Sequence, residues 1–332
     1  MNRSIQITFA VVVALLLCCV LTPAQSFYAS PSRAERVEKP LASFGVLSDV
    51  HVVSDWQPAH LNGALKFANA LRDLRTYHPD FIVVNGDLTT NGSPEDLSLA
   101  REIANDHAGC PLYPTMGNHD YYHSWDNPSW SDARAQAQFL RTFSLPNLYY
   151  DKWVHGAHLI FLSSEQYFRQ QKERGEAAWL SNQQLHWFAN TLRSAPAAPT
   201  FVFLHQPLDG TVGKSDPDVS AVQSVELLDL ASHYPHIVWF SGHSHIDAEA
   251  PSEAVVKRGV HFYGLGSVYE PIELTADPTP GSEKRGEGLY LHPHPERSES
   301  RFVELYPDRI VIKTRLHHLA TWSDQVETIP LR

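Results

Sequence analysis

The chain has 332 residues, of which 43% are hydrophobic and 11% aromatic, and this composition is ordinary for a packed globular protein and argues against disorder. Its formal net charge of −11 argues against broad electrostatic affinity for nucleic-acid polymers or anionic membranes. Large polyanions are therefore poor candidate substrates, although a metal site could still attract phosphate locally.

The N-terminus has the pattern of an export signal. Arg3 precedes an uncharged apolar stretch over residues 9–21, and the small residue Ala24 follows it closely. The stretch is too short for a stable membrane span, so we expect a signal peptide at residues 1–24 and an exported protein, periplasmic or extracellular. An uncleaved N-terminal anchor is the alternative, because the stretch does not end in a clean Ala-x-Ala cleavage site.

A polar segment separates this signal from the rest of the chain. Residues 25–40 lack a sustained hydrophobic period and predict a flexible tether, so we expect a single domain over residues 41–332. Cys18 and Cys19 would leave with the signal, and Cys110 would remain without a partner for an internal disulfide. Stability must then come from the core and from any bound metal.

From residue 41 onward, apolar runs alternate with helical patterns. Strands are predicted at residues 42–47, 81–84, 112–116, 157–162, 200–204 and 237–240. Helices are predicted around residues 61–71, from Ser93 onward, and at residues 133–143, 181–192 and 222–232. Capping boxes mark the helix starts at Ser93 and Ser181. This alternation predicts an α/β fold with a mostly parallel sheet covered by helices.

The C-terminal part departs from this alternation. Residues 271–300 are rich in proline, glycine and charge and predict a long loop insertion. Residues 301–314 alternate around a turn and predict a C-terminal hairpin.

Five polar clusters follow predicted strands. They are Asp49-Val50-His51, Asn85-Gly86-Asp87, Gly117-Asn118-His119-Asp120, His205 and Gly242-His243-Ser244-His245. Such groups are costly to bury singly, and the carboxyl ends of parallel strands meet at one edge of a sheet. The clusters therefore predict a shared site, for which a metal centre is the simplest explanation.

The residue types in these clusters suit a metal centre with two ions. Asp49 and His51 are two residues apart, so an extended backbone projects both to the same side, and the same holds for His243 and His245. The mixed nitrogen and oxygen set favours iron, manganese or zinc over calcium. Two divalent ions would outweigh the charges of Asp49 and Asp87, and the surplus favours a bound hydroxide and an anionic ligand, as hydrolysis at phosphorus requires.

The order Asp-x-His, Gly-Asp, Gly-Asn-His-Asp, His and Gly-His-x-His resembles the calcineurin-like metallophosphoesterase family over about residues 42–315. The resemblance implies a four-layer α/β/β/α sandwich with a dinuclear site. It implies as ligands Asp49, His51 and His245 for one ion, Asn118, His205 and His243 for the other, and Asp87 as the bridge. A metal-bridging hydroxide would attack phosphorus in line. His119 would stabilise the transition state or protonate the leaving oxygen, and Asp120 would orient its imidazole.

Two positions narrow the branch of the family. Purple acid phosphatases have a tyrosine three residues after the bridging aspartate, where this chain has Thr90, and protein Ser/Thr phosphatases carry an arginine after Gly-Asp that this chain lacks. The pattern is most similar to class III cyclic-nucleotide phosphodiesterases. We therefore expect a small phosphodiester substrate, with cyclic nucleotides among the candidates, or a phosphomonoester as in a nucleotidase. A non-catalytic binding scaffold is the other alternative, although all seven ligand positions are retained.

Several aromatic and histidine residues lie outside this pattern. Tyr121-Tyr122-His123, Trp125, Trp130 and Tyr149-Tyr150 follow the third cluster. They could form a wall that stacks a ring beside the metals, or a packed loop over the sheet edge, and both interpretations stay open. We interpret His123 as a surface residue. The pairs His292/His294 and His317/His318 are interpreted as solvent-exposed histidines outside the site.

Overall fold

The computed structural model describes residues 38–55, 62–167, 176–276, 282–285 and 289–331. From Lys39 onward the chain forms one compact unit. The predicted signal peptide and all of the predicted tether before Glu38 lie outside the described residues. Among the helices that are described, none is both long enough and apolar enough to cross a membrane.

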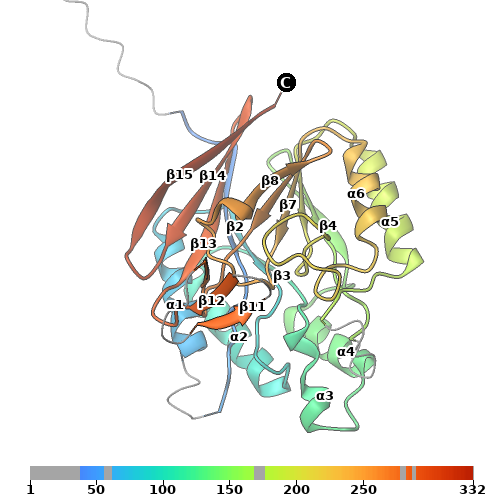
Figure 1. Cartoon of the computed structure of the whole chain (residues 1–332). Coiled ribbons are helices and arrows are strands. Elements are labelled where there is room, and N and C mark those ends of the chain that lie inside the picture. The colour runs from blue at the N-terminus through green and yellow to red at the C-terminus, as the bar shows by residue number, and fades with distance from the viewer. Residues whose placement is uncertain (1–37, 56–61, 168–175, 277–281, 286–288, 332) are drawn as a thin grey trace, which may run out of the picture. The chain divides into compact units, whose positions relative to one another are not determined.

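Two six-stranded sheets form the centre of the unit (Figure 1). The first has the strand order β15-β14-β13-β1-β2-β3 and the second the order β4-β5-β6-β7-β9-β8. The first comprises β1 (Ala42–Leu47), β2 (Phe81–Asn85), β3 (Leu112–Thr115), β13 (Glu299–Leu305), β14 (Arg309–Leu316) and β15 (Thr321–Pro330). The second comprises β4 (Tyr150–Val154), β5 (Ala157–Phe161), β6 (Thr200–Phe203), β7 (Ile237–Ser241), β8 (Ala254–Lys257) and β9 (Val260–Gly264).

Each sheet is parallel in one part and antiparallel in the rest. In the first sheet β1, β2 and β3 run parallel. Strand β13 pairs antiparallel with β1, β14 with β13, and β15 with β14. In the second sheet β5, β6, β7 and β9 run parallel, with β4 and β8 antiparallel at the edges. The parallel strands bring their carboxyl ends to one edge of each sheet, as predicted.

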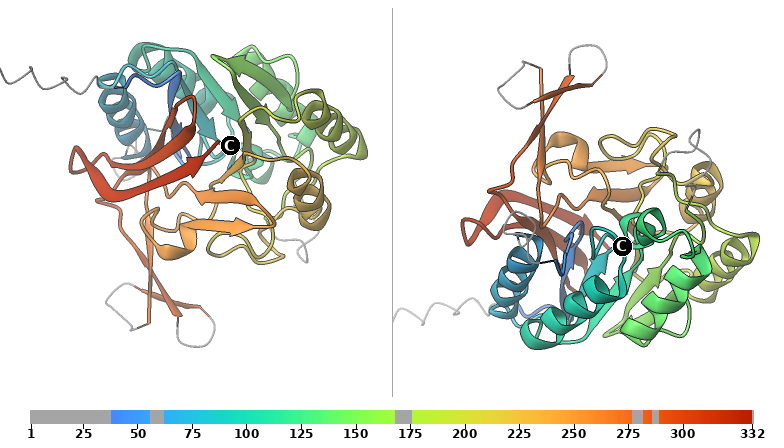
Figure 2. Two further views of the ribbon diagram at one scale, coloured as in Figure 1. Left: turned by 90° about the horizontal axis from the view of Figure 1, so that it is seen from above. Right: turned by 90° about the horizontal axis from the view of Figure 1, so that it is seen from below.

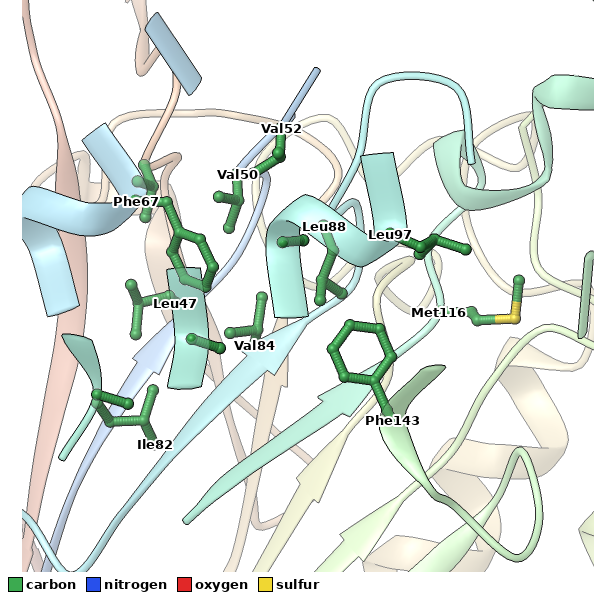
Figure 3. Close-up of a cluster of buried hydrophobic side chains, with 14 of the residues drawn as sticks. Leu47, Val50, Val52, Phe67, Ile82, Val84, Leu88, Leu97, Met116 and Phe143 are labelled. Atoms are coloured by element: carbon green, nitrogen blue, oxygen red, sulfur yellow. The ribbon is translucent and has the colours of Figure 1, made fainter. Parts of the chain in front are cut away.

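Alternating side chains of the strands build three hydrophobic layers. Phe81 and Val83 of β2 belong to the cluster between the two sheets, together with Phe203 of β6. Ile82 and Val84 point the other way, into an outer cluster with α1 (Asn62–Arg75) and α2 (Pro94–His107) (Figure 3). This period of two, with both faces apolar, is what a buried parallel strand requires.

The second sheet has its own outer layer. Val202 and Leu204 pack with residues of α5 (Asn182–Ser194) and α6 (Ser224–Ser232), such as Phe188 and Leu227. Figure 1 shows these two helices side by side. The order helix, sheet, sheet, helix confirms the four-layer α/β/β/α sandwich.

Serine hydroxyls cap both predicted helix starts, but neither capping box is complete, since Ser93 N donates to Asn91 Oδ1 rather than to Asp96. The Ser93 hydroxyl accepts a hydrogen bond from Asp96 N at 3.0 Å, and Ser181 accepts one from Gln184 N at 3.2 Å. Gln184 does not complete a capping box, because Ser181 N donates to Glu165 Oε2 at 2.6 Å instead. In α1, Leu65 is 61% exposed, whereas Ala68 and Leu71 are buried. The predicted spacing therefore identified the core face of this helix only in part.

The segment expected to be a long loop contains a small sheet. Strands β10 (Ile272–Thr275), β11 (Glu283–Arg285) and β12 (Leu289–Pro293) pair in the order β10-β12-β11 and extend away from the large sheets (Figure 2). The prediction was wrong here because strand pairing satisfies the backbone groups even where the composition is rich in turn residues. The predicted hairpin matches β13 and β14, and β15 extends it.

Candidate metal centre

The five polar clusters lie directly after five strands. Asp49 and His51 follow β1, Asp87 follows β2, Asn118 follows β3, His205 follows β6, and His243 and His245 follow β7. The first three strands belong to one sheet and the last two to the other. The site is therefore built where the carboxyl ends of both sheets meet.

The structure brings the predicted ligand side chains together. Three sets have ligand atoms within 4.8 Å of one another: Asp49, His51 and His245; Asp87, His205 and His243; and His51, Asp87 and His119. Asn118 joins the second set, because its Oδ1 lies 3.0 Å from His243 Nδ1. The first two sets are the groups that the family pattern implied for the two ions, and Asp87 connects them through the third.

The spacing between these atoms fits coordination of shared ions. Asp49 Oδ1 lies 3.1 Å from His245 Nε2, and Asp87 Oδ2 lies 3.1 Å from His205 Nε2. His51 Nε2 lies 3.1 Å from His245 Nε2. Two ligand atoms at about 2.1 Å from one ion, at right or tetrahedral angles, are themselves about 3.0–3.4 Å apart.

Outer hydrogen bonds direct imidazole lone pairs into the centre. His205 Nδ1 lies 2.8 Å from the Asn85 carbonyl oxygen, and His245 Nδ1 lies 3.0 Å from the Glu270 carbonyl oxygen. A carbonyl oxygen only accepts, so each Nδ1 carries the hydrogen and Nε2 holds the lone pair of the neutral ring. The Nε2 of His205 is buried and makes no well-aligned hydrogen bond, although Asp87 Oδ2 lies 3.1 Å away, and this arrangement fits a metal ligand.

Two carboxylates are buried in this centre. Asp49 and Asp87 are 0% and 1% exposed. Burial alone would raise the pKa of Asp49, but His245 and His205 outweigh it and lower the pKa to about 2. Burial would likewise raise the pKa of Asp87, and His205 and His119 hold it well below its usual range. Both groups are therefore ionised at neutral pH.

The histidines divide into two kinds. Burial would lower the pKa of His205, but Asp87 and Asp49 raise it to about 9. Burial, with the neighbouring His119, lowers the pKa of His51 to about 3, and burial with the neighbouring His205 lowers that of His243 to about 3. Without a cation, the proton on His205 compensates the negative charge of Asp87 and Asp49. A bound cation would compensate that charge instead.

The backbone is strained at most of the candidate ligands. The left-handed region is unusual for residues other than glycine, and each such residue costs of order 1–2 kcal/mol. Strain of this kind is retained where the surrounding structure enforces it, commonly at functional sites. Five candidate ligands adopt it: Asp49 (φ 53°), His51 (φ 53°), Asp87 (φ 47°), His243 (φ 68°) and His245 (φ 56°).

Glycines beside the ligands allow their close approach. A Cβ at Gly117 would overlap Asp87 Oδ1 and Asp87 N. A Cβ at Gly86 would overlap the His205 ring, and this glycine also has φ +84°. The Gly-Asp and Gly-Asn-His-Asp motifs therefore need glycine for space at the centre.

The predicted acid pair is present, but its two members interact differently from the expectation. The Asp120 carboxylate accepts hydrogen bonds from Thr89 N (3.1 Å), Thr89 Oγ1 (2.8 Å) and Gly117 N (3.0 Å). His119 Nδ1 instead lies 2.8 Å from the Thr90 carbonyl oxygen. Asp120 therefore makes no direct hydrogen bond to the imidazole in this arrangement, because its two carboxylate oxygens accept from the loop backbone at Thr89 and Gly117. Burial and the neighbouring Asp87 raise the pKa of Asp120 to about 6.

The aromatic residues that follow the third cluster lie partly in the core and partly beside the candidate metal centre, so each of the two interpretations holds for some of them. Tyr149 and Tyr150 are 7% and 6% exposed and belong to the core. Tyr122 lies against the centre, with its ring centroid 4.1 Å from that of His119. His123 is partly buried, with its ring 4.8 Å from that of Trp130, so it is a partly exposed residue that packs against the aromatic segment.

Two of the histidines placed outside the site are buried in ion pairs rather than exposed. His294 lies 3.0 Å from both Glu273 and Glu296. His317 Nδ1 lies 2.7 Å from Asp73 Oδ2, with its side chain 2% exposed. The predicted exposure was wrong because Glu273 and Asp73 come from other parts of the chain, which spacing in the sequence does not reveal, and because Glu296, two residues after His294, was not recognised as its partner.

The chain is similar to several known proteins. A glycerophosphodiester phosphodiesterase of Enterobacter lignolyticus is 30% identical over 189 residues, which are 53% of this chain and 58% of that protein. A probable cyclic nucleotide phosphodiesterase of Synechococcus sp. is 26% identical over 208 residues, which are 61% of this chain and 73% of that protein. The matched region thus spans less than two thirds of the first relative.

Solved structures share the fold. A dimetal phosphatase from Danio rerio aligns with a TM-score of 0.61 at 15% identity, covering 89% of this chain and 100% of that one. The purple acid phosphatase PPD1 from yellow lupin aligns with a TM-score of 0.54 at 12% identity, covering 87% of this chain and 53% of that one. The family model for calcineurin-like phosphoesterases matches residues 42–247, more than half of the chain, and the chain belongs to the calcineurin-like phosphoesterase family.

Proposed function

We propose that this protein hydrolyses small phosphodiesters with a pair of metal ions bound at the candidate centre. The observation that carries the proposal is the convergence of two ligand sets on Asp87. Neighbouring ligand atoms lie 3.1 Å apart, which is the separation expected of two atoms that bind the same ion. The preference for a diester is supported by the relatives, whose names describe diesterases. Phosphomonoester hydrolysis and a non-catalytic scaffold are the outcomes that a test must distinguish.

The chemistry divides between the ions and the chain. Bound ions would polarise the phosphoryl oxygens and lower the pKa of a water at the site. The chain's own contribution is to hold a proton donor beside them. Because His119 Nδ1 donates to the Thr90 carbonyl oxygen, Nε2 is the nitrogen that can exchange a proton with the leaving oxygen.

The position of His119 supports this role. A ring nitrogen of His119 lies within 4.8 Å of the ligand atoms of His51 and Asp87. Its backbone N donates to Asp87 Oδ1 at 2.9 Å, which ties the proton donor to the carboxylate between the two ligand sets. Asp120 acts through the backbone of Thr89, next to the carbonyl that holds the imidazole, and we assign it as a positioning residue.

Turnover of two chromogenic esters tests the proposal. The purified chain is treated with chelator, reloaded with Mn²⁺ or Zn²⁺, and assayed on bis-p-nitrophenyl phosphate and p-nitrophenyl phosphate. We expect metal-dependent hydrolysis with the higher kcat/KM on the diester. His119→Ala should lower kcat on the order of 10²–10⁴-fold while metal content is retained.

A matched control uses a histidine far from the centre. His233 lies beside α6 with its side chain 65% exposed, so His233→Ala should keep wild-type turnover. Undiminished turnover in His119→Ala would overturn the assigned role. Higher kcat/KM on the monoester would replace the diesterase by a monoesterase, and bound metal without turnover of either ester would indicate the scaffold.

We also propose that the protein is exported. The proposal is supported by Arg3 and the apolar stretch over residues 9–21. Expression of the full chain in a Gram-negative host, followed by fractionation and mass measurement, should give a soluble periplasmic product that lacks residues 1–24. A full-length product in the membrane fraction would indicate the uncleaved anchor, and one in the cytoplasm would contradict export.

A further inference from the structure

The side-chain amide of Asn118 has partners on both of its ends. Its Oδ1 lies 3.0 Å from His243 Nδ1, on the side of the candidate ligands. Its Nδ2 donates to Tyr122 Oη and to Glu176 Oε2, both at 3.0 Å. An ionised carboxylate only accepts, so Glu176 determines which end of the amide is NH₂ and directs the carbonyl oxygen toward His243.

We propose that Tyr122 and Glu176 are positioning residues that hold Asn118 as a ligand of the second metal ion. The inference rests on the proposed function, because it requires that Asn118 binds an ion. An amide is a neutral and weak ligand, and without fixed partners it could rotate so that its NH₂ group, rather than its oxygen, faces the ion. Two fixed acceptors for the NH₂ group prevent that rotation before an ion binds.

Glu176 is itself held in place beside the second ligand set. Its backbone N donates to the Asp218 carbonyl oxygen at 3.0 Å. Its own carbonyl oxygen accepts a hydrogen bond from Gln206 Nε2 at 3.1 Å. Gln206 is 1% exposed and directly follows His205. The backbone of Glu176 is therefore tied to the same loop that supplies a histidine of the second set.

Tyr122 contacts the centre twice, with different parts of its side chain. Its hydroxyl accepts from Asn118, one turn earlier in the chain, while its ring lies 4.1 Å from the His119 ring at an interplanar angle of 34°. The hydroxyl thus acts on a candidate ligand and the ring on the proposed proton donor. Removing one part at a time separates the two effects.

Metal affinity is the readout that does not depend on turnover. The metal-free full chain is titrated with Mn²⁺ or Zn²⁺ by calorimetry. We expect two binding events in the wild type. Tyr122→Phe and Glu176→Ala should each weaken one event about 10–100-fold and leave the other unchanged, as for other residues that orient a metal ligand.

Conservative variants distinguish positioning from general disruption. Glu176→Gln keeps an acceptor oxygen and should restore most of the affinity lost in Glu176→Ala. Tyr269→Phe is the matched tyrosine control, because the Tyr269 ring contacts His51 of the first ligand set at 5.4 Å and phenylalanine keeps that ring; it should leave both events unchanged. Tyr122→Leu, which also removes the ring, should lower kcat beyond the effect of Tyr122→Phe.

The outcomes separate this inference from the proposed function. Wild-type affinity for both ions in Tyr122→Phe and Glu176→Ala would overturn the inference and leave the metal centre intact. Equal weakening of both events would also overturn it, because the effect would not be confined to the ion held by Asn118. Fewer than two events in the wild type would instead contradict the proposed function.

Discussion

Substitution of Asp87 by asparagine should affect both metal sites, whereas the same change at Asp49 should affect one. Asp87 belongs to ligand sets with His51 and with His205, while Asp49 belongs only to the set with His51. Asparagine has the size of aspartate, and its Oδ1 can still accept the hydrogen bond from His119 N, which is 2.9 Å long in the wild type. The change therefore removes a charge with little change in shape.

The magnitude follows from the distances in the centre. A unit charge about 3 Å from another interacts by roughly 5 kcal/mol at an effective dielectric constant of about 20. Since about 1.4 kcal/mol corresponds to a tenfold change in affinity, loss of this charge should weaken each ion that it contacts on the order of 10³-fold or more. Asp87→Asn should thus lose both ions at concentrations where Asp49→Asn still holds one.

Stepwise calorimetric titration with Zn²⁺, together with the metal content after dialysis, measures this difference. The expected stoichiometries at micromolar metal are two for the wild type, one for Asp49→Asn and none for Asp87→Asn. Circular dichroism checks that the variants are folded. Equal stoichiometries for the two variants would refute a bridging position for Asp87.

Two further predictions concern space and burial. Gly117→Ala should weaken metal binding at least tenfold, because the new Cβ would overlap Asp87. Gly156→Ala is the control, because a Cβ has open space there, and it should leave metal binding unchanged. Equal effects of the two variants in a metal titration would contradict the steric argument. Burial raises the pKa of Glu253 from 4.5 to about 7, so the proton that stabilises the fold below pH 4.5 is lost as the pH rises through 7. The resulting cost at pH 8 is on the order of 3 kcal/mol. Thermal melting at pH 5 and pH 8 should therefore show a smaller pH dependence for Glu253→Gln than for the wild type, and an unchanged dependence would refute this assignment.

Strong local signals in the sequence identified the strands that carry the ligands. The run at residues 81–84 is apolar on both faces because β2 is buried between the helices and the second sheet, and such a run is recognisable without a partner. The polar clusters were recognisable for the same reason, since each ends a strand of this kind. Their convergence also followed from the rule for parallel strands.

The elements that the sequence did not reveal depend on partners. Strand β15 alternates weakly, and Val326 is 53% exposed, so only its pairing with β14 makes it a strand. The three strands within residues 271–300 likewise form through their register with one another. Propensity along one segment cannot show such pairing.

The outer contacts of the site were missed for a related reason. Thr90 holds His119 through a carbonyl oxygen, and Glu176 reaches Asn118 from 58 residues away in the chain. A backbone acceptor has no residue signature, and a lone glutamate in the sequence has no distinguishing spacing. Adjacency of Asp120 to His119 in the chain did not mean contact between their side chains, because Asp120 holds the backbone of Thr89 instead.

A crystal structure of the metal-loaded protein, with anomalous diffraction recorded at the edge of the metal, tests the central claim most directly. The account predicts two anomalous peaks about 3.5–4 Å apart on either side of the Asp87 carboxylate, one beside Asp49, His51 and His245 and the other beside Asn118, His205 and His243. A single peak, or peaks away from these side chains, would contradict it.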